Sequence, residues 1–273
     1  MPELPEVETT CRGIKPHVIH QSLTSVNVRF PTLRWPIPKE SLAHLKGRRV
    51  TEVTRKGKYI LLFVGTGYVI IHLGMSGNLR IVRGALTPVK HDHVIFSFDN
   101  DVHMVLNDPR RFGCCLYHSD KDSMHPLLSD LGCEPLSDAF DANRLYLACQ
   151  GRSKAIKQLI MDSHVVVGVG NIYACEALHK AKISPTAAAS SLSVEQASSL
   201  VKAIKSVLGA AIDQGGTTLR DFVNSDGKPG YFKQQLQVYG REGNPCRNCG
   251  SKIQRDILAK RSTFYCPLCQ AVL

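Results

Sequence analysis

The pattern of hydrophobic and polar positions divides the chain into a strand-rich first half and a helical second half. Near the start, apolar side chains recur at steps of three and four residues, which is typical of one buried helix face. These positions are Leu4, Val7, Cys11, Ile14 and Val18. From about residue 24 to residue 118, β-branched or alternating runs such as "SVNVRF" and "HVIFSFDNDVHMVLND" are separated by Gly, Asn and Asp. These runs predict strands, "DND" predicts a hairpin turn, and the lack of intervening helices predicts an antiparallel β-sandwich.

Helical periodicity takes over after the turn-rich, acidic stretch "HPLLSDLGCEPLSDAFD", which we interpret as the domain boundary. The segments "SKAIKQLIMD", "VGVGNIYACEALHKA" and "SVEQASSLVKAIKSVLGAAIDQ" predict helices, and Ser193 is the expected N-cap of the last one. The following "GGTTLRDFVNSDGKPGYF" is glycine-rich and has no apolar period, so it predicts a long loop. Loops of this length in compact domains are often functional.

The charge of the chain changes this picture by indicating a partner. The formal net charge is +11 in 273 residues, and the segment from Arg12 to Lys58 alone carries +9, whereas Asp120 to Arg144 carries −4. A basic face indicates a polyanion such as nucleic acid, the alternative being a basic surface without such a partner. No apolar run approaches the ~20 residues that span a bilayer, and the N-terminus lacks the pattern of a secretory signal. With ten cysteines and no export signal, the sequence predicts a reducing, cytoplasmic setting.

Four of the cysteines form two pairs with the spacing of a metal site. "CRNC" contributes Cys246 and Cys249, "CPLC" contributes Cys266 and Cys269, and sixteen residues separate the pairs. This spacing predicts a four-thiolate zinc site, which is closed and therefore structural. A reducing compartment disfavours two disulfides, and an iron–sulfur cluster stays open as the less natural alternative. The intervening "GSKIQRDILAKRSTFY" alternates as a basic β-hairpin does, and the other six cysteines are expected to fill the core.

Two turn motifs place apolar side chains beside glycines. "HLGMSGNL" puts Met75 between glycines, and "NDPRRFGCC" puts Arg110 and Phe112 in a turn before Gly113. Each motif alone could be a loop with one apolar anchor in the core. Together, in a basic protein, they suit a different use, in which apolar side chains wedge into a stacked duplex and an arginine fills the space that a base has left.

The first residues have more acids than a helix start requires. Pro5 and the neighbouring glutamates suit a first helical turn, but that leaves Pro2 and Glu3 unexplained. Removal of Met1 exposes the secondary amine of Pro2, and an α-amine has a pKa near ~7.7–8.0 against ~10.4 for lysine. Its attack on a sugar aldehyde carbon gives an iminium, an electron sink that permits elimination of phosphate. Glu3 could move protons there, and Lys58 is either a second proton donor, a phosphate ligand or a surface lysine.

Motifs along the whole chain resemble those of one family. They are "PELPEVET", "RKGKYILL", "HLGMSG", "KHDHV", "DPRRFG", "VGVGNIYACEAL", "GGTTLRDF", "SDGKPGYF", "LQVYGREG" and the cysteine quartet. From Pro2 to Cys269 the chain resembles bacterial formamidopyrimidine-DNA glycosylases, also called 8-oxoguanine-DNA glycosylase/AP lyases. The resemblance implies a monomeric base-excision-repair enzyme with one structural zinc ion. Such an enzyme excises oxidised purines from duplex DNA and cuts abasic sites by β,δ-elimination.

The resemblance also implies an α+β fold. Its parts are an N-terminal antiparallel β-sandwich with a leading helix, a helical helix–two-turns–helix domain and a zinc-finger β-hairpin, with DNA in the cleft between. We place these parts at residues 2–130, 150–240 and 241–273, with a linker over 131–149.

Individual roles follow from the same resemblance. It makes Pro2 the Schiff-base nucleophile, Glu3 the proton donor, Lys58 the donor for β-elimination and Arg261 the donor for δ-elimination. The residues implied in the lesion pocket are Glu6 and Lys157. The residues implied in DNA contacts are Met75, His91, Arg110, Phe112, Arg152 and Asn171. The loop over 215–232 corresponds to a flap over the flipped base.

Two other functions stay open from the sequence. A glycosylase for oxidised pyrimidines, similar to endonuclease VIII, typically starts PEGPE, and Leu4 argues against that family. A non-catalytic zinc protein that only binds damaged DNA is the other alternative. Retention of Met1 would favour it, because the Pro2 nitrogen would then be an unreactive amide.

Overall fold

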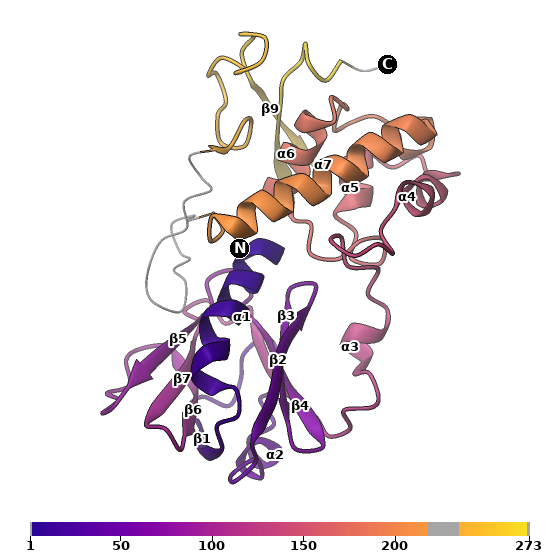
Figure 1. Cartoon of the computed structure of the whole chain (residues 1–273). Helices are drawn as coiled ribbons and strands as arrows, with labels where there is room; N and C mark the ends of the chain where they lie inside the picture. Colours follow the sequence, from indigo (N-terminus) through magenta and orange to yellow (C-terminus); the bar gives the residue numbers. More distant parts are fainter. Residues whose placement is uncertain (1, 218–234, 272–273) are drawn as a thin grey trace. The chain divides into compact units, whose positions relative to one another are not determined.

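The structure, a computed structural model, describes residues 2–217 and 235–271 and divides into two compact units (Figure 1). The first unit comprises Met1–Ser129 with Gln214–Lys233, and the second comprises Asp130–Asp213 with Gln234–Leu273. Within the described residues, no helix has both the length and the apolar character that crossing a bilayer requires.

The first unit consists of two antiparallel sheets around one hydrophobic core. One sheet has the order β1-β6-β7-β5 and the other the order β2-β3-β4-β8. Their strands are β1 (Leu23–Val28), β2 (Val50–Lys56), β3 (Tyr59–Val64), β4 (Gly67–His72), β5 (Asn78–Arg83), β6 (Asp92–Phe98), β7 (Val102–Asn107) and β8 (Cys114–His118). Two short helices, α2 (Lys39–Ala43) and α3 (Pro126–Ser129), also belong to the unit. Residues of both sheets share one core, which confirms the predicted sandwich, and the "DND" turn joins β6 to β7 as expected.

Helix α1 (Leu4–Val18) closes the core and carries the start of the chain. Its five periodic apolar side chains are buried, the most exposed being Cys11 at 6%. The helix contacts β2 and β3 of one sheet and β5 and β7 of the other. Proline in the first turn and the Glu3–Glu6 capping box fix the residue at which the helix begins. The predicted helix is therefore confirmed, and its buried face makes it a rigid mount for the residues that precede it.

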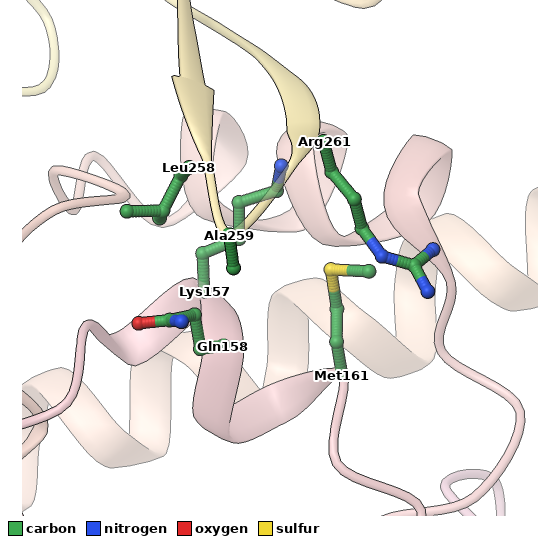
Figure 2. A pocket seen from close by; sticks show the side chains of 6 residues that line it. All are labelled: Lys157, Gln158, Met161, Leu258, Ala259 and Arg261. Carbon is green, nitrogen blue, oxygen red and sulfur yellow. The ribbon is translucent and has the colours of Figure 1, made fainter.

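The second unit is helical, with a small hairpin near the end of the chain. Its elements are α4 (Ala142–Cys149), α5 (Ile156–Ile160), α6 (Asn171–Lys180), the 3-10 helix η1 (Ala189–Ser191), α7 (Val194–Asp213), β9 (Gln254–Leu258) and β10 (Arg261–Tyr265). The three predicted helices correspond to α5, α6 and α7. Ser193 caps α7 as expected, since its Oγ accepts a bond from the backbone N–H of Gln196 at 3.2 Å. The predicted hairpin is β9–β10, and Figure 2 shows Ala259 at its turn.

The segment 131–149, which we expected to be a linker, contains helix α4. Asp141 caps this helix by accepting the backbone N–H of Arg144 at 2.7 Å. Leu145 and Cys149 are fully buried, and α4 packs against α7. The expectation failed because acids and turn residues dominate the stretch, while only two apolar side chains, four residues apart, make the buried face.

The six cysteines expected to fill the core do so with one exception. Cys11, Cys114, Cys115, Cys149 and Cys175 are buried, whereas Cys133 is half-buried. Burial raises the pKa of the Cys11 thiol to about 12 and that of Cys114 to about 11, so these groups stay protonated.

Candidate functional site

The start of the chain is held by one buried carboxylate. Glu6 is 2% exposed, and its Oε2 accepts the backbone N–H of Glu3 at 2.8 Å. Its Oε1 accepts both the backbone N–H and the hydroxyl of Thr217, at 2.8 and 2.9 Å. Pro2 and Glu3 are themselves buried. Within the first unit, Glu6 therefore joins the residues expected to do chemistry to the first residues of the glycine-rich loop. The rest of that expected flap, 218–232, lies outside the described residues.

Lys58 sits at the turn of a hairpin that α1 holds in place. Lys56 pairs with Tyr59, so Gly57 and Lys58 form a two-residue turn between β2 and β3. Glu8 of α1 binds the Nε of Arg55 at 2.8 Å, and Arg55 in turn donates to the carbonyl of Gly57 at 3.4 Å. Burial opposes ionisation of Glu8, but its bonds to Arg12 and Arg55 outweigh burial and lower its pKa. The charged Glu8–Arg55 pair thus ties the turn that carries Lys58 to the helix that carries Pro2.

His72 is a neighbour of Lys58 that the sequence did not single out. Burial, and then the charges of Lys58 and Arg34, lower the pKa of His72 to about 4, so its ring is neutral near pH 7. Its Nδ1 accepts the backbone N–H of Gly74 at 3.0 Å. His72 therefore links the surroundings of Lys58 to the turn that presents Met75. Its position directly before "LGMSG" is the signal that could have found it.

The two turns with apolar side chains meet on a single aspartate. Asp108 is fully buried and accepts the hydroxyl of Ser76 at 2.9 Å and the backbone N–H of Gly113 at 2.8 Å. At Gly74, which has a φ of +63°, a Cβ would clash with the backbone of residues 112 and 113. Glycine is therefore required for the two turns to approach this closely.

The apolar side chains of the two turns, Met75 and Phe112, face solvent instead of the core. Met75 is 37% exposed and Phe112 is 47% exposed, so neither is a core anchor. The guanidinium of Arg110 lies 5.0 Å from the centre of the Phe112 ring. The structure thus places together the three residues expected to enter a duplex, on one rigid support.

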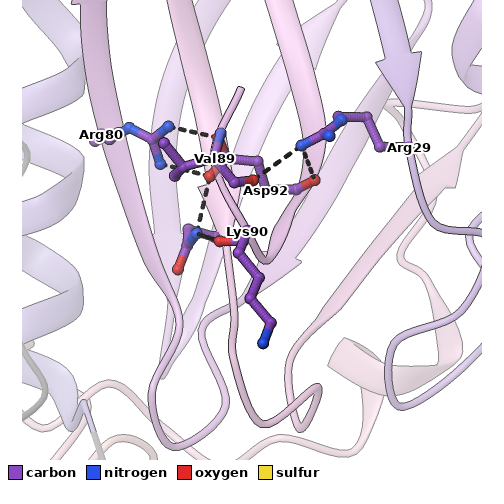
Figure 3. Close-up of polar contacts among 6 residues, drawn as sticks. Arg29, Arg80, Val89, Lys90 and Asp92 are labelled. Carbon is purple, nitrogen blue, oxygen red and sulfur yellow. Dashed lines mark hydrogen bonds and ion pairs between the residues drawn. The ribbon is translucent and has the colours of Figure 1, made fainter. Parts of the chain in front are cut away.

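An ion pair made by a buried aspartate fixes the loop that bears His91, a further residue expected to contact DNA. Asp92 is fully buried and binds Arg80 through two bonds of 2.6 Å, and it accepts Asn107 Nδ2 and the Val89 backbone N–H at 2.8 Å each (Figure 3). The side chain of Lys90 extends away from these contacts in Figure 3. The carbonyl of His91 accepts the backbone N–H of Asp108 at 3.1 Å. His91 is therefore anchored next to the aspartate that supports the Met75 and Phe112 turns.

In the second unit, Lys157 lies beneath the hairpin. It is 1% exposed, and its ammonium donates to Asn171 Oδ1 at 2.6 Å and to Thr263 Oγ1 at 2.7 Å. Asn171 Nδ2 also donates to the carbonyl of Ser262 at 2.9 Å. Figure 2 shows the Lys157 side chain extending from α5 to the hairpin, with Arg261 on the strand that these bonds hold. The structure thus gives Lys157 and Asn171 a contact with strand β10 that the sequence did not predict.

A cavity of about 190 Å³ opens beside Arg261. Its lining combines apolar and polar side chains from α5 and the hairpin, namely Lys157, Gln158, Met161, Leu258, Ala259 and Arg261. Arg152 is exposed in the same unit, after the end of α4, and is not among these residues. The candidate residues of this unit are therefore the buried Lys157 with its half-buried partner Asn171, an arginine at a cavity and an exposed arginine.

The four spaced cysteines come together as the sequence predicted. All four Sγ atoms lie within 4.8 Å of one another, with 3.4 Å between Cys249 and Cys266 and 3.9 Å between Cys246 and Cys269. Tetrahedral zinc with Zn–S bonds of ~2.3 Å requires sulfurs roughly 3.8 Å apart, so the donor set fits the metal. None of the ten cysteines is in a disulfide, so the disulfide alternative is wrong. Bound there, zinc would have no open position and would supply fold stability instead of catalysis.

Comparison with known proteins gives matches over most of the chain. Residues 1–115 match the formamidopyrimidine-DNA glycosylase N-terminal domain, 131–223 its H2TH domain, and 243–272 a zinc finger found in FPG and IleRS. The formamidopyrimidine-DNA glycosylase of Methylococcus capsulatus is 53% identical over 270 residues, covering 99% of this chain and 100% of that protein. That of Legionella pneumophila (strain Lens) is 50% identical, with full coverage of both chains.

Solved structures with a similar fold come from the same family. The MutM (Fpg) protein of Thermus thermophilus has a TM-score of 0.89 at 40% identity, and the match covers both chains fully. Lactococcus lactis Fpg in complex with DNA containing an abasic site has a TM-score of 0.91 at 32% identity, covering 98% of this chain and 99% of that one. An antiparallel N-terminal domain, an H2TH domain and a four-cysteine zinc finger together define a DNA glycosylase with one structural zinc. The chain belongs to the formamidopyrimidine-DNA glycosylase family, which also has AP lyase activity.

The zinc site predicts a defined metal content. Replacing the buried Cys266 (Cys266→Ser) removes one of four thiolates, so we expect zinc to fall from one ion per chain to near zero, as mass spectrometry of the purified protein would measure. Cys175→Ser is the matched control, because Cys175 packs in the same small core without belonging to the four-sulfur cluster. Full zinc occupancy in Cys266→Ser would contradict the assignment of the ligands.

The ion pair between the buried Asp92 and Arg80 predicts a pH-dependent loss of stability. Burial raises the pKa of Asp92, but the bonds from Arg80, Asn107 and Val89 outweigh it, so the pKa is lowered overall. Hydrogen bonds to charged groups contribute about 1.5–3 kcal/mol, and Arg80 keeps access to solvent, so we expect Asp92→Asn to lower the free energy of unfolding in urea by roughly that amount near pH 7.

The difference between Asp92→Asn and the wild type should depend on pH in one direction. Because the folded pKa lies below the unfolded value of about 3.9, the stabilisation is fully present above pH ~4 and is lost as pH falls through the folded pKa. The exposed Asp101→Asn is the control, since asparagine tolerates the φ of +58° there. Equal stability of Asp92→Asn and wild type at pH 7 would contradict this account.

Proposed function

We propose that the chain is a bifunctional DNA glycosylase and AP lyase of base excision repair. Its substrates are oxidised purines, 8-oxoguanine and formamidopyrimidines, in duplex DNA, and it then cuts the strand by β,δ-elimination. The observation that carries the proposal is the start of the chain, where Pro2 and Glu3 are buried and Glu6 holds the backbone of Glu3. A mutant of Lactococcus lactis Fpg has been solved with DNA that contains Fapy-dG, and Lactococcus lactis Fpg with DNA that contains an abasic site, which supports this substrate class.

The chemistry begins with the Pro2 nitrogen. Its lone pair forms a bond to C1′ of the damaged nucleotide while the bond from C1′ to the base breaks. The base leaves with that electron pair and takes up the proton that the Pro2 nitrogen loses when its N–C1′ bond forms. Glu3 supplies the proton that opens the sugar ring, which leaves an iminium ion between Pro2 and C1′. This cation acidifies the C2′–H bond, so loss of that proton expels the phosphate on the 3′ side. A second elimination expels the phosphate on the 5′ side.

Side chains from both units are suited to assist these steps. Lys58 at its hairpin turn is the proton donor for the first elimination, and the pair formed by Glu8 and Arg55 holds that turn. Arg261 donates in the second elimination and binds phosphate. Glu6 in the first unit and Lys157 in the second are the residues that we expect at the damaged base. Glu6 bonds to Thr217, and Lys157 bonds to the strand that carries Arg261.

Access to the damaged base requires that it leave the duplex stack. The exposed Met75 and Phe112 side chains are suited to wedge between bases, and Arg110 is suited to fill the space that the extruded base vacates. His91, Arg152 and Asn171 contact the phosphate backbone, in keeping with the net charge of +11.

Trapping with cyanoborohydride tests the proposed function. Reduction of the iminium should give a covalent protein–DNA complex with an 8-oxoguanine duplex, and less of it with a thymine glycol duplex, on a denaturing gel. The intact mass of the protein should lack Met1. Preference for the oxidised pyrimidine would indicate specificity like that of endonuclease VIII. Tight binding with no adduct, together with retained Met1, would indicate a protein that only binds damage.

The wedge role of Met75 predicts a selective defect. We expect Met75→Ala to lower kcat/KM for 8-oxoguanine excision about tenfold or more, since ~1.4 kcal/mol of lost stabilisation corresponds to tenfold and unstacking costs a few kcal/mol. Met124→Ala is the control, because Met124 is 51% exposed in the same unit but lies outside the two turns. Similar rates for Met75→Ala and wild type would contradict the wedge role.

A further inference from the structure

The ring of His179 reaches the zinc-binding cluster from outside it. Its Nε2 lies 3.6 Å from Cys246 Sγ, and the two residues are 2% and 3% exposed. His179 is on α6, whereas the four cysteines lie more than sixty residues further along the chain. The four clustered cysteine sulfurs already provide the full number of ligands for structural zinc. His179 is not one of these four ligands. The ring is therefore adjacent to the metal site without completing it.

Helix α6 is held at several points against the zinc module, by which we mean residues 237–271 with the four cysteines. These contacts fix the position of the His179 ring. The carboxylate of Glu176 accepts the backbone N–H groups of Gln237, Val238 and Tyr239 at 2.8, 3.0 and 2.8 Å. Cys175 packs in one small core with Cys246. Residues 175, 176 and 179 lie on one face of the helix, so the chain entering the zinc module and the sulfur of Cys246 meet the same face.

We propose that His179 is a positioning residue for the zinc site, whose Nε2–H donates a hydrogen bond to the Cys246 thiolate and slows the loss of the metal. A zinc-bound thiolate keeps much of its negative charge, and a buried charge needs hydrogen-bond donors. Residues of the module supply some donors to the sulfurs, such as the backbone N–H groups of Asn248 and Cys269 at 3.4 Å. His179 adds a donor from α6, so metal retention depends on the helical part of the unit.

Zinc release from the complete, zinc-loaded protein tests this assignment. The rate is followed by the colour change of an excess chelator, 4-(2-pyridylazo)resorcinol, at neutral pH. Because outer-shell partners are typically worth 10–100-fold in metal affinity, we expect His179→Leu to release zinc about tenfold faster or more. His179→Gln keeps an N–H donor at a similar reach, so its rate should stay within about threefold of wild type.

Lys180→Leu is the matched control, since it changes the exposed neighbour on the same helix. It should release zinc at the wild-type rate. Release from His179→Leu at the wild-type rate would overturn the proposal. Equally fast release from His179→Leu and His179→Gln would overturn it too, because ring packing and not the donor would then matter.

A spectroscopic readout needs no destabilising variant. In the zinc-loaded wild-type protein, long-range ¹H–¹⁵N correlation spectra report which ring nitrogen carries the proton, and the spectrum of His179→Gln identifies the signal. We expect the neutral form of His179 protonated at Nε2, coupled to the hydrogen-bonded sulfur. A neutral ring protonated at Nδ1 would contradict the proposal even if the variants lose zinc.

Discussion

The carboxylate of Glu6 is the contact on which the proposed chemistry depends most directly. It accepts a hydrogen bond from the Glu3 backbone and two from Thr217, so both segments are attached to the first turn of α1. The helix is itself fixed, because its apolar face is buried against strands of both sheets. A nucleophile at the end of a chain would otherwise be mobile. Here the side chain of Glu6, which the core of the first unit fixes, holds the backbone of Glu3, the residue next to Pro2.

A buried carboxylate also holds an irregular segment at three other places. Asp108 holds the two turns that present Met75 and Phe112, Asp92 holds the loop before β6, and Glu176 holds the segment that enters the zinc module. In each case a buried carboxylate accepts backbone N–H groups from irregular segments. Such segments lack the hydrogen bonds of a helix or sheet, and a carboxylate supplies several strong acceptors at one point. The exposed side chains for which we propose a role in DNA binding are thus carried by loops that buried acids hold in place.

Much of the fold follows from local pattern. The period of α1, the alternation of the strands and the spacing of the four cysteines each depend on neighbours in sequence, and each prediction was confirmed. Helix α4 was missed because Leu145 and Cys149 are its only buried side chains. Two apolar positions are too few to reveal a helical period among acids and turn residues.

The candidate site could be predicted as a set of residues but not as an arrangement. Glu6 bonds to Thr217 across more than two hundred positions, and Lys157 bonds to Thr263 across more than one hundred. Neither contact leaves a periodic signal, since each depends on how distant segments pack. Lys157 illustrates the consequence, because its burial beneath the hairpin is invisible in "SKAIKQLI", where it looks like an ordinary helical lysine. His179 was missed for the same reason, because its contact with Cys246 joins positions 67 residues apart.

The identity of the nucleophilic amine tests the central claim most directly. The covalent complex with 8-oxoguanine DNA would be reduced, digested with protease and nuclease, and mapped by tandem mass spectrometry. The account predicts that the sugar remnant is attached to the nitrogen of Pro2, in a peptide that lacks Met1. Attachment to Lys58 or to another lysine would contradict it, because the chemistry would then not depend on how α1 holds the start of the chain.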